Sequence, residues 1–130
     1  MIVFDAGVLI AHLEIDDPFH RAAVDFLEEN EDSEFAISPL TLAECLVRPA
    51  AAATGRRAYH ALRRLRLEHR AITHDDALGL AEMRATTGLK MSDALVVFTA
   101  EAHGAEVATT DRAVARAAEA RGLTTHLLEA

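Results

Sequence analysis

Short apolar runs alternate with longer amphipathic segments along the chain. The short runs, bounded by acidic or turn residues, predict strands near residues 1–5, 34–38, 70–73, 106–110 and 123–127. Segments whose apolar residues recur every three or four positions predict helices over 7–14, 19–30, 39–47, 56–69, 75–87, 93–103 and 112–121. Strands and helices that alternate in this order predict an α/β fold built on a parallel sheet.

Capping and turn residues define where these elements begin and end. Ser38 and Pro39 begin one helix, and Pro49 is expected to end it, because proline has no N–H to donate. The apolar stripe of the helix over 56–69 consists of Ala58, Leu62 and Leu65. The last three helices are expected to end before Gly88, Gly104 and Gly122. No linker or repeat interrupts the pattern, so we expect one domain over residues 1–130.

Composition narrows the class of protein. The hydrophobic fraction of 51% excludes a disordered chain, and no apolar run approaches the roughly 20 residues that cross a bilayer, so we expect no membrane partner. The first apolar stretch has no basic residues before it and ends at Asp5, which is unlike a secretory signal and indicates a cytoplasmic protein. A net charge of −8 argues against binding nucleic acid with the whole surface, so any such contact must be local.

Four acidic residues are associated with four different apolar segments. Asp5 and Asp111 each follow a predicted strand directly, Asp93 begins a predicted helix, and Glu44 lies within one. Because ligands bind at the carboxyl ends of parallel strands, we expect such side chains to converge there. Converging carboxylates repel one another unless a cation joins them, and Mg²⁺ or Mn²⁺ suits oxygen ligands and phosphate chemistry. The pattern therefore favours metal-dependent phosphodiester hydrolysis.

Each of these residues also has a simpler interpretation. A surface carboxylate is usually solvated, and Asp93 and Asp111 could merely stabilise helix N-termini by about 0.3–1 kcal/mol each. Cys45 is the single cysteine and fits a small buried hydrophobe. The histidines lack the spacing of zinc ligands, so none is assigned a metal.

Four segments together carry a resemblance to a known family: Ile2–Asp5, Ser38–Glu44, Ser92–Val97 and Val107–Asp111. In their order and spacing the chain resembles the PIN domain family, and in particular the VapC-type toxin ribonucleases of bacterial toxin–antitoxin systems. The resemblance implies a three-layer PIN-like fold, with a central parallel sheet of about five strands flanked by helices. It also implies a Mg²⁺-dependent endoribonuclease that leaves a 5′-phosphate and a 3′-hydroxyl, a cognate antitoxin and a homodimer.

The family's site residues can be assigned to positions in this chain. Its catalytic and metal-binding acids correspond to Asp5, Glu44, Asp93 and Asp111, and its supporting threonine corresponds to Thr109. One position departs from the family, which usually has Ser or Thr two residues after the first Asp, where this chain has Gly7. The hydroxyl of Thr110 is a candidate to replace the missing one.

Basic residues near the acids are candidates to bind RNA. Lys90 and Arg112 lie beside Asp93 and Asp111 in sequence and are the better candidates for contacting a phosphate. A stripe that could follow an RNA backbone consists of Arg56, His60, Arg63 and Arg70. That stripe could equally be a solvated helix face or contact an acidic inhibitor.

Apolar stripes at helical spacing indicate the core. One consists of Met91, Leu95, Phe98 and Ala102, and another of Phe19, Phe26 and Leu27. The resemblance implies that part of one stripe forms a dimer or antitoxin interface.

Three other functions compete with the nuclease. A haloacid-dehalogenase-like phosphatase needs a second Asp at position 7, where the chain has Gly7, and a receiver domain needs an acidic pair after its first strand. A PIN scaffold kept only for binding is the stronger alternative. Gly7 supports it slightly, and the presence of all four acids argues against it.

Overall fold

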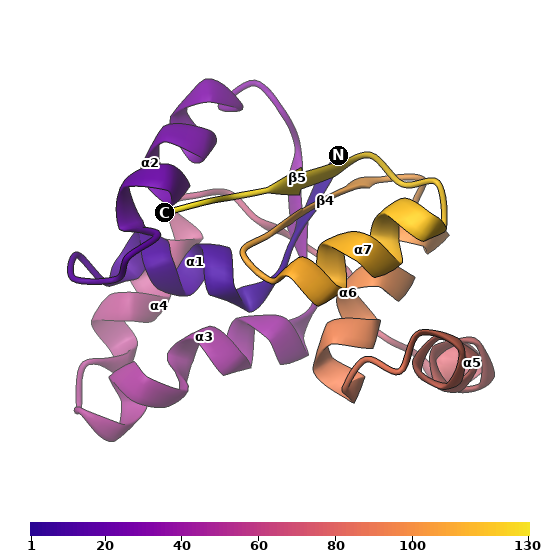
Figure 1. Cartoon of the computed structure of the whole chain (residues 1–130). Coiled ribbons are helices and arrows are strands. Elements are labelled where there is room, and N and C mark those ends of the chain that lie inside the picture. The colour runs from indigo at the N-terminus through magenta and orange to yellow at the C-terminus, as the bar shows by residue number, and fades with distance from the viewer.

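The computed structural model describes all 130 residues (Figure 1). The elements along the chain are β1 (Ile2–Phe4), α1 (Ala6–Leu13), α2 (His20–Glu29), β2 (Phe35–Ile37), α3 (Pro39–Ala51), α4 (Gly55–Arg63), β3 (Glu68–His69), the 3₁₀ turn η1 (His74–Asp76), α5 (Ala77–Thr87), α6 (Met91–Ala102), β4 (Glu106–Thr109), α7 (Arg112–Ala120) and β5 (Thr125–Leu127). No helix is both long enough and apolar enough to span a bilayer.

The five strands form one parallel sheet in the order β3-β2-β1-β4-β5. This confirms the predicted fold class. The chain runs outward from β1 to β2 and β3, then returns to place β4 on the other side of β1. The strand order therefore reverses between β1 and β4, and the carboxyl ends of these two strands border the crevice where open α/β sheets bind ligands.

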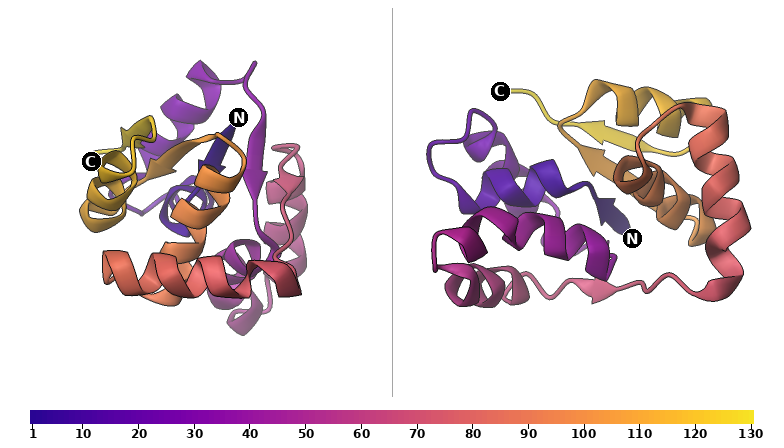
Figure 2. Two further views of the ribbon diagram at one scale, coloured as in Figure 1. Left: turned by 90° about the vertical axis from the view of Figure 1, so that its right-hand side faces the viewer. Right: turned by 90° about the horizontal axis from the view of Figure 1, so that it is seen from below.

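Alternating side chains of β1 supply two separate cores. Ile2 and Phe4 pack into a core that also receives residues from α1 to α4, and Val3 packs into a second core with α5, α6 and α7. Side chains of a strand point to opposite faces in turn, so helices must cover both faces of the sheet. The two views of Figure 2 show the helices arranged around the sheet in this way. The three-layer arrangement is thus confirmed.

The prediction that Pro49 ends its helix is wrong. The helix α3 continues through Pro49 to Ala51. A proline in the last turn removes a single hydrogen bond, the one its N–H would have donated to the carbonyl of Cys45, and this loss is tolerated near a helix end. The Pro49 carbonyl then accepts the N–H of Thr54 at 2.8 Å, which closes the turn into α4.

The predicted helix over 56–69 is too long at its C-terminal end, and the predicted strand over 70–73 is misplaced. The helix α4 ends at Arg63, Arg66 has a left-handed φ of 55°, and the third strand is Glu68–His69. Leu65 and Leu67 both pack against the core and belong to the approach to β3, although Leu65 also fits the helical spacing. The bounds of the remaining elements agree with the predictions to within a residue or two.

Candidate active site

Asp5 is a buried carboxylate at the end of the central strand. It directly follows β1, occupies the N-cap position of α1 and is 8% exposed. Its Oδ2 accepts a hydrogen bond of 2.6 Å from the hydroxyl of Thr109. Burial raises the pKa of Asp5, the Thr109 hydroxyl and the Ala6 N–H lower it, and the charges of Asp111 and Glu44 raise it further. Hydrogen bonds therefore hold the ionised carboxylate in place, while burial raises the free energy of its charged form.

Thr109 connects two acids across adjacent strands. It is fully buried at the end of β4, and its Oγ1 donates to Asp5 and accepts the Asp111 N–H at 2.9 Å. Asp111 Oδ1 in turn accepts N–H bonds from Ala113 at 2.7 Å and Val114 at 3.2 Å, so this residue caps α7. The capping interpretation of Asp111 is thus correct, but both bonds use Oδ1, which leaves Oδ2 available to a ligand.

Glu44 and Asp93 face the same region from α3 and α6, and both are half-buried. Burial raises the pKa of each, and Asp93 raises the pKa of Glu44 further. The charges of Asp5 and Asp111 raise the pKa of Asp93. The structure therefore brings four acids from four different parts of the chain together, each within electrostatic reach of at least two of the others.

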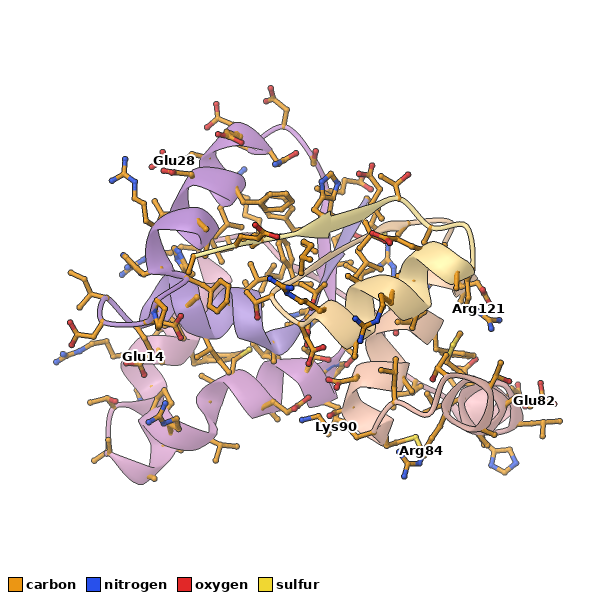
Figure 3. All side chains as sticks on the ribbon, viewed as in Figure 1. Glu14, Glu28, Glu82, Arg84, Lys90 and Arg121 are labelled. Atoms are coloured by element: carbon orange, nitrogen blue, oxygen red, sulfur yellow. The ribbon has the colours of Figure 1, made fainter.

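Lys90 supplies positive charge to two of these acids. It is exposed at the N-cap position of α6, and its ammonium lowers the pKa of both Glu44 and Asp93. Figure 3 shows Lys90 beside α3 and α6. An exposed ammonium at the rim of an acidic group can contact an incoming phosphate while it partly offsets the carboxylate charge.

The acids do not form a preassembled metal cluster. No three Asp, Glu, His or Cys side chains of the chain are arranged to hold a metal ion. Asp5 and Asp111 lie at the carboxyl ends of β1 and β4, Glu44 and Asp93 approach from α3 and α6, and the roles of all four as ligands stay a prediction.

Ser92 was missed by the sequence analysis as a site residue. Its side chain lies close enough to Glu44 to lower the pKa of that carboxyl. Its position directly before Asp93, within the segment Ser92–Val97 that carries the family resemblance, was the available signal.

The remaining predicted residues lie in different places. Arg112 is exposed at the first position of α7, next to Asp111. Arg63 is on α4, which packs on α3 and α1 rather than on α6 or α7 (Figure 1). There Arg63 borders a separate groove of about 320 Å³ that is also lined by Leu42, Leu62, Arg66, Leu67 and His69.

The predicted stripe of Arg56, His60, Arg63 and Arg70 is not formed as a whole. Arg70 follows β3 and pairs with Glu68 at 2.8 Å, so it does not share a helical face with Arg63.

Most residues of the two apolar stripes pack in the core. Leu27 and Leu95 are buried, and Phe19, Phe26 and Phe98 pack against the two cores. Met91 remains 45% exposed. More exposed apolar surface lies on α3, where Leu40 and Val47 are 46% and 64% exposed.

Cys45 lies close to the acids but is not a nucleophile. Its Sγ is 3.8 Å from the Ala6 carbonyl oxygen, and burial, with the charges of Glu44 and Asp5, raises the pKa of the thiol to about 12. The thiolate is the reactive form, so we expect a disulfide reagent at pH 8 to modify native protein at least about 100-fold more slowly than unfolded protein. Rapid modification of the native chain, followed by absorbance of the released thiol, would contradict this environment.

Comparison with known proteins identifies the family. The PIN domain family matches residues 2–120, so the chain belongs to this family. A toxin–antitoxin complex from Klebsiella pneumoniae contains a similar chain, with 27% identity, coverage of 85% of this chain and 87% of that one, and a TM-score of 0.69. No curated protein matches the sequence.

Two further solved structures share the fold at lower identity. VapBC2 from Rickettsia felis, bound to a DNA fragment from its promoter, matches with 17% identity over 99% of this chain and 100% of that one, at a TM-score of 0.76. FitAcB from Neisseria gonorrhoeae matches with 21% identity over 97% and 96%, at a TM-score of 0.67.

Proposed function

We propose that the chain is a Mg²⁺-dependent endoribonuclease and the toxin component of a type II toxin–antitoxin module. The observation that carries the proposal is the gathering of four carboxylates beside the strand-order reversal, where the charges of neighbouring acids help to raise the pKa of Asp5, Glu44 and Asp93. In a structural ion-pair network, nearby cations would offset these negative charges. Here Lys90 is the cation that lowers the pKa of Glu44 and Asp93, and no cation lowers that of Asp5. An acidic group with this excess of negative charge favours a cation.

The donors suit a hard divalent ion. All four are carboxylates, and Mg²⁺ is usually bound through one or two carboxylates plus water and substrate phosphate. Asp5 and Asp93 are the main proposed ligands, with Glu44 and Asp111 bound directly or through water, and Mn²⁺ is an alternative ion. When bound, such an ion lowers the pKa of a water molecule and neutralises charge that develops on a phosphodiester.

The chain's own residues position the carboxylates and the RNA. Thr109 holds one oxygen of Asp5, and the N-terminus of α7 holds one oxygen of Asp111, so both acids are oriented before any ligand binds. Lys90 and Arg112, exposed beside the acids, are proposed to contact the phosphates on either side of the cleaved bond. Arg63 is proposed to bind RNA farther from the acids, along the groove next to α4.

The proposed partners are a cognate antitoxin and a second copy of the chain. The 27% identical relative was solved as a toxin–antitoxin complex, which supports a protein partner. The exposed side chains of Leu40, Val47 and Met91 offer apolar surface that a partner could cover.

The proposal is tested by RNA cleavage with purified protein that carries no bound inhibitor. Structured and single-stranded RNA should be cleaved in Mg²⁺, left intact in EDTA and cleaved again when excess Mg²⁺ is restored. Products are resolved on a denaturing gel, and their ends are checked for a 5′-phosphate. Cleavage that persists in EDTA would exclude the metal-dependent chemistry. Absence of cleavage under all conditions would favour the non-catalytic scaffold.

A further inference from the structure

Gly7 leaves a space that is filled by another residue of the site. It is the second residue of α1, and glycine is among the least favourable residues in a helix. Its backbone does not require glycine, because positive φ angles occur at Gly88, Gly104 and Gly122 and not at Gly7. A Cβ at this position would lie 2.5 Å from the Oγ1 of Thr110. The absent side chain therefore makes room for the Thr110 hydroxyl.

Thr110 lies between two residues that already order the acids. Thr109 precedes it and donates to Asp5, and Asp111 follows it and caps α7. The Thr110 hydroxyl lies against Gly7, which is two residues after Asp5. It is therefore located at the start of α1, close to the end of β1 that carries Asp5. Thr109 is already committed to bonds with Asp5 and Asp111, so its hydroxyl cannot serve a third group equally well.

We infer that Thr110 is a positioning residue of the acidic site and that Gly7 is needed to admit its hydroxyl. This inference rests on the proposed function. A hydroxyl here can donate to a carboxylate or to water held among the carboxylates, which reduces the cost of keeping several negative charges together. The donor comes from the end of β4 in this chain, instead of from a side chain at position 7 of α1.

A matched pair of substitutions separates the hydroxyl from the shape of the side chain. Thr110→Val keeps the shape and removes the donor, whereas Thr110→Ser keeps the donor. Groups that support metal ligands typically change metal affinity or activity by about 10–100-fold when mutated. We therefore expect Thr110→Val to weaken Mg²⁺ binding to RNA-free protein by about 10-fold, measured by calorimetry, and Thr110→Ser to stay within about twofold of wild type.

Moving the hydroxyl to position 7 gives a second, independent measurement. Gly7→Ser alone should weaken Mg²⁺ binding, because its Cβ collides with Thr110. Gly7→Ser combined with Thr110→Ala should bind Mg²⁺ more tightly than Thr110→Ala alone, because the new serine has both the space and a hydroxyl. Thermal denaturation in EDTA selects variants that remain folded, and the Val and Ser replacements of Thr110 test the hydroxyl even if the position 7 variants unfold.

Two results would overturn the inference. In the first, Thr110→Val binds Mg²⁺ as tightly as wild type does. In the second, Gly7→Ser combined with Thr110→Ala binds Mg²⁺ no more tightly than Thr110→Ala alone. If wild-type protein binds Mg²⁺ and cleaves RNA while Thr110→Val is unchanged, only this inference fails. If wild-type protein does neither, the proposed function fails with it.

Discussion

Asp5→Asn is expected to reduce Mg²⁺-dependent RNA cleavage by at least about 100-fold. The substitution keeps the size of the side chain and an oxygen that can accept the Thr109 hydroxyl, but it removes the negative charge proposed to bind the ion. A metal contributes several kcal/mol of transition-state stabilisation, and each 1.4 kcal/mol is about a factor of ten in rate. Initial rates on one labelled RNA, with equal amounts of folded protein, measure the effect.

The same variant should be more stable than wild type when no metal is present. The folded-state pKa of Asp5 is raised above its ordinary value of 3.8, mainly by burial. Stability from the protonated acid is therefore complete below pH 3.8 and is lost as the pH rises through the raised pKa. The asparagine side chain of the variant has no charge to bury, so Tm in EDTA at pH 7 should rise by a few degrees, at about 2–8 °C per kcal/mol for domains near this size.

A charge-matched control distinguishes the site from general electrostatics. Glu28→Gln also removes one negative charge, but from the exposed surface of α2. Glu28 is labelled in Figure 3, well away from Lys90. This control should cleave RNA and melt as wild type does.

If expression of wild-type protein arrests growth, Glu28→Gln should also arrest it, whereas Asp5→Asn and Asp93→Asn should not. Full cleavage by Asp5→Asn would refute the role assigned to this carboxylate.

Thr109→Val is expected to lower both stability and activity. Valine keeps the shape of this fully buried side chain, but Asp5 loses its hydroxyl donor and the Asp111 N–H loses its acceptor. A buried polar group left without a partner costs about 1–3 kcal/mol, so the metal-free protein should lose at least about that much unfolding free energy. Urea denaturation at pH 7 in EDTA measures this loss, and the cleavage assay shows whether the displaced acids still function.

Thr99→Val is the matched control for this second result. Thr99 is also buried, at 6% exposed, but it lies on α6 beyond the turn that carries Asp93, and it takes no part in the bonds that hold Asp5 and Asp111. We expect it to cost less stability than Thr109→Val and to leave cleavage near the wild-type rate. Equal effects of the two substitutions would mean that Thr109 contributes only packing.

The sequence was sufficient to predict the strands that place Asp5 and Asp111. Both follow short apolar runs rich in β-branched residues, and the shortness of these runs and the turn signals beside them favour a strand over a helix. The strand β3 could not be located in the same way. It is short and exposed at the edge of the sheet, so no buried run marks it. Leu65 also fitted the apolar stripe of the predicted helix. The helical path is broken at Arg66, whose φ is left-handed, and no glycine or asparagine at this position signalled the break.

Contacts within the site were less predictable than the backbone. The resemblance to the family pointed to Thr109 as a supporting residue, but not to its bond with Asp5, which joins residues 104 positions apart. The close approach of Thr110 to Gly7 depends on how β4 and α1 pack, which no single segment encodes. The positions of Glu44 and Asp93 relative to Asp5 likewise depend on the packing of α3 and α6.

The most direct measurement is a crystal structure of the wild-type protein grown with saturating Mn²⁺, with data collected at the manganese absorption edge. We expect an anomalous peak at the carboxyl ends of β1 and β4, within coordination distance of oxygens of Asp5 and Asp93. Glu44 and Asp111 should bind the ion directly or through water. A map with no manganese among these four carboxylates, from crystals grown with saturating Mn²⁺, would contradict the account.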